Sequence, residues 1–275
     1  MTASPDALRA GNDWRRFVAP LRGQVGAVCF RHPLFDGYGE YLDLVTAERW
    51  PEIESLNGRI HASGPRFVQQ DTTLLADGLH YEARIAQGRI ATRAESWHDL
   101  FNAMVWMRHP ALKRTLNRQQ CLHIERMGPR ERSPAQQALT QFDESGVVVQ
   151  VRDKALLDLW DRHDWVGLFH ANAGRWSDGG ISVAAVIGHA LMEQMLVPGR
   201  LLVGKCLVVL GDPVDSVARV VESIVAGTSL VTPTELRPLP LSGIPGWHAG
   251  QGAEFYGNAD YFRPLREGRV YPRPL

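Results

Sequence analysis

Strand-like and helix-like segments alternate along most of this chain, and the alternation limits the folds that it can adopt. Residues 147–151 and 201–210 are short apolar runs rich in valine and leucine, as in buried strands. Residues 134–142, 153–160 and 214–226 have apolar positions at helical spacing. Because each such element must bury an apolar face, the pattern predicts helices packed on a small sheet in a mixed α/β or α+β fold.

The length of the chain and its charge balance set further limits. Its 275 residues, 44% of them hydrophobic, are enough for a large core, and no linker-like segment divides them. We therefore expect one compact domain over residues 1–275, with an N-terminal arm (1–24), a body (25–241) and a C-terminal tail (242–275). From Thr232 onward, the tail included, the chain is rich in proline and aromatic residues, so this segment should wrap the surface in extended form. Thirty basic side chains balance thirty acidic ones, which argues against nucleic-acid binding through a basic surplus.

The cysteines and the first residues bear on the location of the protein. Cys29, Cys121 and Cys206 are few, odd in number and far apart, which argues against a disulfide framework or a cysteine zinc site. The start, MTASPDALRAGNDWRRF, has no apolar run after a basic head, so no secretory signal is expected. No window reaches the ~18 to 20 apolar residues of a membrane span. The sequence thus predicts a cytoplasmic protein without a membrane span.

The first clear local pattern is LHYEARIAQGRIATR, residues 79–93. Apolar and polar residues alternate before and after the pair Gln87-Gly88, which is a frequent turn composition. The pattern predicts a β-hairpin with its turn at the glycine.

The segment WHDLFNAMVWMRHPALK, residues 97–113, carries the densest group of polar and aromatic side chains. Ser96 is a suitable N-cap, and Asp99 lies where the acidic partner of a capping box belongs, so a helix should begin here. Pro110 should stop or kink this helix, and a second short helix should follow over 111–117.

His98 and Asn102 lie four residues apart on that helix, so their side chains share a face. In a functional site, His98 would act as the acid/base, because an imidazole titrates near neutral pH, and Asn102 would orient the substrate. In a structural role, Asp99 would cap the helix while His98 and Asn102 belong to a hydrogen-bonded surface. Both interpretations stay open.

A second candidate group lies in GISVAAVIGHALMEQMLVP, which reads as one apolar helix over 182–196. On such a helix Ser182, His189 and Glu193 form one narrow polar line. A helix that is apolar nearly all round is usually buried, and a buried charge must be paired, hydrogen-bonded or beside a cavity. Three interpretations stay open: a structural hydrogen bond between His189 and Glu193, a metal-free polar pocket facing the 97–113 helix, or a pair of metal ligands.

Asp143 and Glu144 are adjacent carboxylates in FDESG, at the end of a predicted helix. Either could supply the further ligand that a metal at His189 and Glu193 would need, although adjacent residues in a turn usually point apart. Lys205 lies in an apolar strand, where an inward-facing amine would have a lowered pKa, although alternation favours the exposed face.

The strong signatures of common enzymes are absent from the sequence. There is no phosphate-binding loop, no strand–GxGxxG–helix unit, no GxSxG, no HExxH and no EF-hand loop. The sequence therefore names no cofactor, which stays unknown at this point.

The quoted segments also carry a family resemblance. HYEARIAQGRIATR running into SWHDLFNAMVWMRHPALKRTLN, then ALTQFDESGVVV, GHALMEQMLVPGRLLVGK and SGIPGWHAGQGAEFYGNADYFRPLRE, resemble the bacterial family catalogued as domain of unknown function 3025. The resemblance covers residues 25–267 and implies a bacterial cytoplasmic protein with one domain. It brings no catalytic role to any residue.

Two classes of function follow. The first is an acid/base, hydrolase-like enzyme with a pocket lined by His, Asp and Glu; its candidate residues are His98, Asp99, Asn102, Asp143, His189 and Glu193. The second is a non-catalytic binding or assembly protein in which the same residues are structural. A small molecule or another protein is a possible partner in either class, and convergence of these side chains on one pocket would favour the enzyme.

Overall fold

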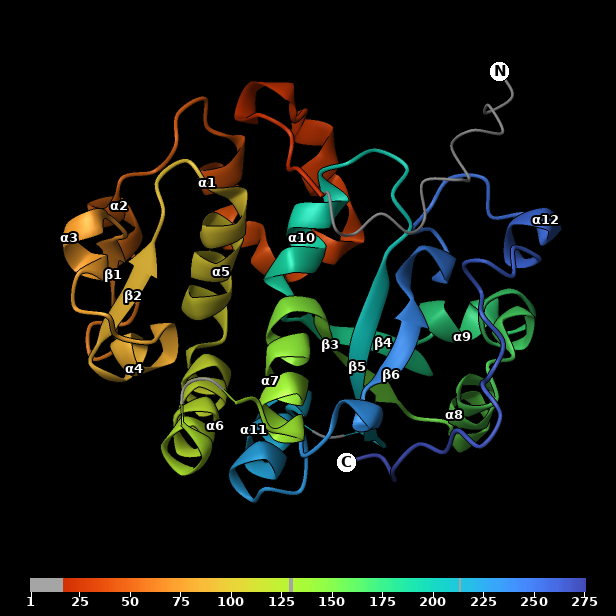
Figure 1. Ribbon diagram of the computed structural model, residues 1–275. Coiled ribbons are helices and arrows are strands. Elements are labelled where there is room, and N and C mark those ends of the chain that lie inside the picture. Colours follow the sequence, from red (N-terminus) through yellow and green to blue (C-terminus); the bar gives the residue numbers. More distant parts are fainter. Residues whose placement is uncertain (1–16, 129–130, 213) are drawn as a thin grey trace.

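The structure is a computed structural model that describes residues 17–275 except 129, 130 and 213 (Figure 1). The predicted N-terminal arm, residues 1–24, lies outside the described residues up to residue 16. The strands of the structure are β1 (Arg66–Gln69), β2 (Arg89–Thr92), β3 (Gly146–Val151), β4 (Ile181–Val186), β5 (Val203–Leu210) and β6 (Arg237–Pro240). Its α-helices are α1 (Leu42–Thr46), α2 (Ile53–Asn57), α3 (Thr72–Leu75), α4 (Tyr81–Ala86), α5 (Trp97–Arg108), α6 (Pro110–Met127), α7 (Pro134–Ser145), α8 (Lys154–Asp161), α9 (Ala173–Ser177), α10 (His189–Met195), α11 (Ser216–Val225) and α12 (Ala253–Tyr256).

The larger sheet has the strand order β4-β3-β5-β6. The central strands β3 and β5 run parallel, and the outer strands β4 and β6 are antiparallel to their neighbours. Val147, Val148 and Val149 of β3 are fully buried, which explains why this strand reads as a continuous apolar run. The predicted strands in 147–151 and 201–210 are confirmed, and the fold is a mixed α/β arrangement as expected.

The edge strand β6 corrects the expectation that the proline-rich segment after residue 232 only wraps the surface. Pro238 and Pro240 pair with β5 in antiparallel register. Proline cannot donate a backbone hydrogen bond, but an edge strand needs donors on one side only. The indole Nε1 of Trp160 donates to the Pro238 carbonyl at 2.8 Å, which satisfies an acceptor of this edge.

The predicted hairpin over 79–93 is wrong. Its first half is helix α4, and its second half, β2, pairs in parallel with β1 in a separate two-stranded sheet. The His80 ring accepts a hydrogen bond from the Glu82 amide and caps the helix, and Gly88 makes the turn into β2 with φ +84°. Before the turn the alternation consists only of Tyr81, Ala83 and Ile85. Three such positions fit a helical turn as well as a strand, so tertiary packing decided between helix and strand.

In Figure 1, α6 continues below α5, and α7 lies beside α6. The predicted start of α5 is confirmed: the Ser96 side chain accepts a hydrogen bond from the Asp99 amide at 3.3 Å. Pro110 separates α5 from α6, as expected, but α6 extends to Met127 and is much longer than the predicted 111–117. A capping box between Ser133 and Gln136 begins α7.

The predicted helix over 182–196 is wrong in its first half, because residues 181–186 form strand β4 and the helix α10 begins only at His189. The β-branched residues of this segment pair with β3, and Gly188 separates the strand from the helix. Ser182 therefore lies on a strand and does not share a face with His189 and Glu193.

The C-terminal residues pack against the body, and they include helix α12 in place of a wholly extended tail. Tyr256 and Phe262 are buried, and both rings contact Phe169. Buried hydrophobic residues from Phe30 to Phe262 form one contiguous cluster. Within the described part of the chain, the helices are too short or too polar to cross a membrane.

Candidate functional site

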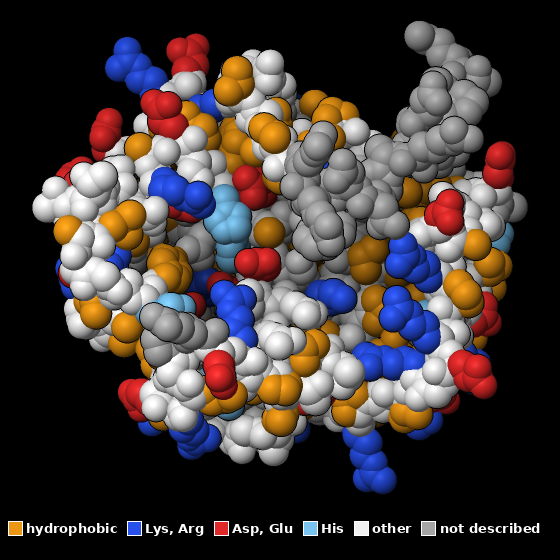
Figure 2. Space-filling view, in the orientation of Figure 1, with side chains coloured by type: hydrophobic (Ala, Val, Ile, Leu, Met, Phe, Trp, Pro, Cys, Tyr) orange, Lys and Arg blue, Asp and Glu red, His pale blue; other side chains and the backbone are white. Residues whose placement is uncertain are grey.

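A cavity of about 330 Å³ lies where α4, α5, α6, α7 and α10 meet β2. On this face of the molecule histidine side chains are visible in a hollow, with acidic side chains on either side (Figure 2). The polar residues of its wall are Gln70, His80, Tyr81, Glu82, Arg93, His98, Asp99, Asn102, Lys113, Asn117, Gln120, Arg132, Gln136, Thr140, Asp143, Glu144 and His189. Polar and titratable side chains from segments far apart in the sequence therefore meet at this cavity.

One face of α5 forms a wall of this cavity. His98, Asn102 and Trp106 follow one another at intervals of four residues, and all three line the cavity. Residues at this spacing point the same way from a helix with 3.6 residues per turn. The opposite face of α5 packs into the core, where Phe101, Met104 and Val105 have no exposed surface.

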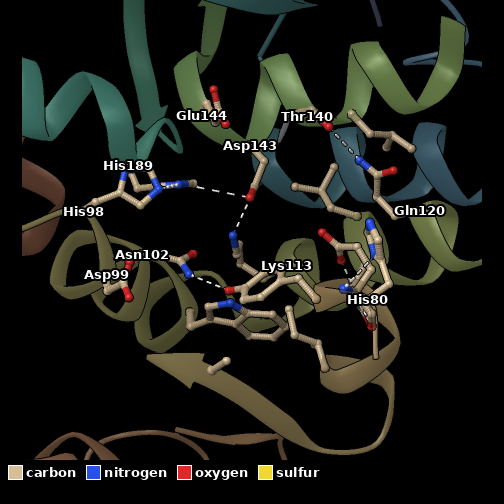
Figure 3. A pocket seen from close by; sticks show the side chains of 18 of the residues that line it. His80, His98, Asp99, Asn102, Lys113, Gln120, Thr140, Asp143, Glu144 and His189 are labelled. Carbon is tan, nitrogen blue, oxygen red and sulfur yellow. Dashed lines mark hydrogen bonds and ion pairs between the residues drawn. The ribbon is translucent and has the colours of Figure 1, made fainter. Parts of the chain in front are cut away.

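Two histidines and a glutamate meet where α10 packs on α5. Figure 3 shows the two histidines, His98 and His189. The Glu193 Oε2 atom lies 3.1 Å from His98 Nδ1. On the other side of the same ring, His98 Nε2 lies 3.0 Å from His189 Nε2, and the two rings meet edge to face. Glu193 does not line the cavity, so it stands behind His98 and orients that ring.

A buried ion pair continues from the histidines into the cavity. His189 Nδ1 faces Asp143 Oδ2 at 4.0 Å, and Asp143 Oδ1 binds the Lys113 ammonium at 2.5 Å. The Lys113 side chain is only 5% exposed, and its ammonium also lies over the Trp106 ring. Glu193, His98, His189, Asp143 and Lys113 thus form a continuous sequence of titratable groups, here called the polar row.

The pKa values of the polar row differ because the surroundings differ. Burial lowers the pKa of His98, but the adjacent Glu193 carboxylate more than offsets this and leaves the pKa raised. Burial lowers the pKa of His189 to about 3. Burial favours protonation of Asp143, yet the Lys113 charge holds the pKa of that carboxyl below its usual value. His98 is therefore the titrating group of the row near neutral pH.

One arrangement of protons is compatible with all the contacts of the polar row. When His98 is an imidazolium, its Nδ1–H donates to Glu193 and its Nε2–H donates to the bare Nε2 of His189. Neutral His189 then carries its proton on Nδ1, directed toward the Asp143 carboxylate. When His98 loses a proton, the shared hydrogen bond reverses and His189 changes tautomer. A proton gained or lost at His98 therefore changes the tautomer of His189 and, with it, whether a proton faces the Asp143 carboxylate.

The other predicted residues have different surroundings. Both carboxylate oxygens of Asp99 accept hydrogen bonds from Arg93, so Asp99 holds that arginine at the cavity rim. The amide of Asn102 donates to the Tyr81 hydroxyl at 3.1 Å. Asp143 and Glu144 both line the cavity, and their side chains point in different directions (Figure 3). Lys205 is half-buried on β5, outside the cavity wall, and burial lowers its pKa.

Sequence reasoning missed three important members of the site. Lys113 had one weak signal, since the chain contains only three lysines among its thirty basic residues. Trp106 could have been found as the next position after His98 and Asn102 at a spacing of four. Tyr81 had no signal, because its segment was taken for a strand.

The metal interpretation of His189 and Glu193 finds no support in the geometry. Glu193 is hydrogen-bonded to His98, and the Nε2 atom of His189 faces the same ring. Across the described residues, no group of three or more His, Cys, Asp or Glu side chains is placed so that it could hold a metal ion. Asp143, one of the two residues predicted as a possible further ligand, instead binds Lys113.

The fold and the cavity define a mixed α/β protein with a polar pocket between helices. The model of the family described as protein of unknown function (DUF3025) matches residues 65–266. The chain belongs to this family, whose matched region contains every residue of the polar row. Comparison with curated proteins and with solved structures found no match.

The difference between the two histidines can be measured directly. We expect the His98 ring to titrate above the ordinary value of 6.5 and the His189 ring to stay neutral down to about pH 3. Replacing Glu193 with glutamine removes the charge that favours the imidazolium, so the pKa of His98 should fall. Imidazole NMR signals followed against pH test this. Equal titration of both rings near 6.5 would contradict the described row.

Proposed function

We propose that the cavity is the active site of an acid/base, hydrolase-like enzyme in which His98 transfers the proton. The observation that carries the proposal is the polar row. It holds one histidine with a raised pKa between a carboxylate and a buried neutral histidine, at the wall of a cavity. Titratable groups with shifted pKa values that gather in a cleft are typical of active sites.

Water is the nucleophile in this proposal. Among the described residues of the cavity wall there is no serine or cysteine that could form an acyl intermediate. Imidazolium His98 exchanges its Nε2–H hydrogen bond to His189 for one to the substrate and donates this proton to the leaving group as the bond from that group to the carbonyl carbon or phosphorus breaks. The attacking water gives a proton to the imidazole as its oxygen bonds to the same carbon or phosphorus. Glu193 acts as a positioning residue, because it holds the His98 ring without touching the cavity.

The second class of function is a non-catalytic binding or assembly protein. The pairing of Lys113 with Asp143 and of Arg93 with Asp99 favours it, because internally satisfied ions also serve as structural clamps. For both classes we propose a bacterial, cytoplasmic setting, supported by the family membership and by the free cysteines Cys29, Cys121 and Cys206. The zero net charge supports a partner other than nucleic acid.

Replacing His98 with glutamine tests the enzyme proposal. The purified protein is assayed on nitrophenyl carboxyl esters, nitroanilides and nitrophenyl phosphates. We expect the variant to lose about 100-fold or more in kcat, because it removes the proton donor and acceptor. Activity of the parent should also decline as the pH rises through the raised pKa of His98.

His61→Gln is the matched control, because His61 is exposed and bonds only to nearby Ser63. We expect this variant to retain full activity. Turnover that survives in His98→Gln would remove His98 from the chemistry. A parent protein without turnover in the whole panel would favour the binding or assembly class.

A further inference from the structure

We infer that the floor of the cavity recognises a neutral amide group. The inference rests on the proposed function only in that the same cavity would hold the substrate. It names the chemical class that the site accepts, a small molecule with a primary or cyclic amide next to an apolar substituent.

The first observation is a set of polar atoms without partners. Two cavity side chains are more than nine-tenths buried and have a polar atom with no hydrogen-bond partner among the described residues: Trp106 Nε1 and Asn102 Oδ1. A buried polar atom without a partner costs about 1–3 kcal/mol. Two such atoms on one cavity point to a ligand that satisfies them.

The chemistry of these atoms sets the ligand pattern. The Trp106 indole can only donate, so the ligand atom beside it must be an acceptor. Asn102 already uses its NH₂ group toward Tyr81, so its free oxygen needs a ligand donor. Asn102 and Trp106 are one helical turn apart on α5, which places the ligand acceptor and donor close together. An amide carries both groups on one carbon.

The charges of the cavity argue against an anionic ligand. Among the described residues, the wall carries Arg93, Lys113 and Arg132 in addition to its histidines, and Asp99 and Asp143 already pair with Arg93 and Lys113. Glu82 and Glu144 add two further carboxylates to the wall. With His98 as an imidazolium, the described residues of the wall carry four positive groups and four carboxylates. They offer a ligand carboxylate no surplus of positive charge, and this balance suits a neutral amide.

The apolar part of the wall accounts for the remainder of the ligand. Ile85, Leu116 and Leu139 line the same cavity beside the Trp106 ring. These side chains suit an apolar substituent on the amide, because removal of its surface from water favours binding.

Three probes of nearly equal shape test the inference on the full-length protein. Benzamide has a donor and an acceptor, acetophenone has only an acceptor, and benzoate carries a charge. We expect benzamide to bind about tenfold more tightly than acetophenone, because acetophenone leaves the Asn102 oxygen without a donor. Benzamide should also move the Trp106 indole N–H signal in the ¹H–¹⁵N spectrum.

Trp106→Phe identifies that signal and removes the donor, and it should weaken benzamide binding about tenfold. Trp165→Phe is the matched control, because the Trp165 indole already donates to the Arg263 carbonyl at 2.8 Å. We expect the control to keep full benzamide affinity. If Trp106→Phe does not fold, the benzamide and acetophenone comparison on the parent protein still decides the question.

Two results would overturn the inference: benzoate binding as tightly as benzamide, or an indole signal of Trp106 that none of the probes moves. These failures are distinct from failure of the proposed function. Benzamide binding by a protein without turnover keeps the amide site and removes the catalysis. Turnover that depends on His98, without benzamide binding, keeps the catalysis and removes the amide site.

Discussion

Replacing Lys113 with methionine is expected to lower the free energy of unfolding by about 3 kcal/mol. The substitution keeps the length and apolar contacts of the side chain but leaves the Asp143 carboxylate without its counter-charge. The lysine side chain is 5% exposed and that of Asp143 is 27% exposed, so water compensates the lost ion pair only in part. The remaining exposure of Asp143 places the expected loss at the lower end of the range for buried pairs.

Urea unfolding of the parent and the variant measures this loss. Lys154→Met is the matched control, because the Lys154 side chain is 74% exposed and pairs with Asp158 on the surface. We expect it to change the free energy of unfolding by less than about 0.5 kcal/mol. The double variant Lys113→Met/Asp143→Leu should recover most of the stability. A loss below about 1 kcal/mol in Lys113→Met would show that the ion pair does not hold α6 to α7.

Gly188→Ala is expected to lower the free energy of unfolding by at least about 2 kcal/mol. Gly188 precedes α10 with a φ of −67°, which any residue adopts, so the cause is steric. A Cβ atom there would lie 2.6 Å from Ser145 Cα and 2.7 Å from the Glu144 carbonyl oxygen. Both are backbone atoms at the end of α7 and cannot move aside without shifting the helix.

The same substitution should also disturb the polar row, because α10 would move and take His189 with it. We expect the pKa of His98 to fall when its contacts with α10 are lost, and imidazole NMR signals report this. Gly174→Ala is the matched control, since no atom lies within 4 Å of a Cβ placed there. That change lies in α9 and should be neutral or stabilising, because alanine favours helix more than glycine does. Equal stability of the two variants would contradict the close packing at Gly188.

Local signals were sufficient where one short segment carried its own boundaries. Ser96 and Pro110 mark the two ends of α5, because a cap and a missing amide act within a few residues. The valine run of β3 predicts a strand buried on both faces, because a strand with one exposed face would alternate apolar and polar residues. The shared face of His98 and Asn102 followed from helical spacing alone.

Short apolar runs without such boundaries were decided by tertiary structure. Residues 181–187 fit a buried helix or a buried strand equally well, and pairing with β3 selected the strand. Residues 81–86 likewise became α4, where Ile85 is buried. Over six residues the local free-energy difference between helix and strand is small, so long-range contacts outweigh it.

The sequence by itself singled out some side chains of the cavity wall as site candidates: His98, Asp99, Asn102, Asp143, Glu144 and His189, together with Glu193 behind His98. Only the tertiary structure decided their partners. His98 is 95 positions from Glu193 and 91 from His189, and they meet because α10 packs on α5. Lys113 reaches Asp143 because α6 packs on α7. Hydrogen bonds and burial act over a few ångströms, so a pKa follows from neighbours in space, which spacing along the chain does not specify.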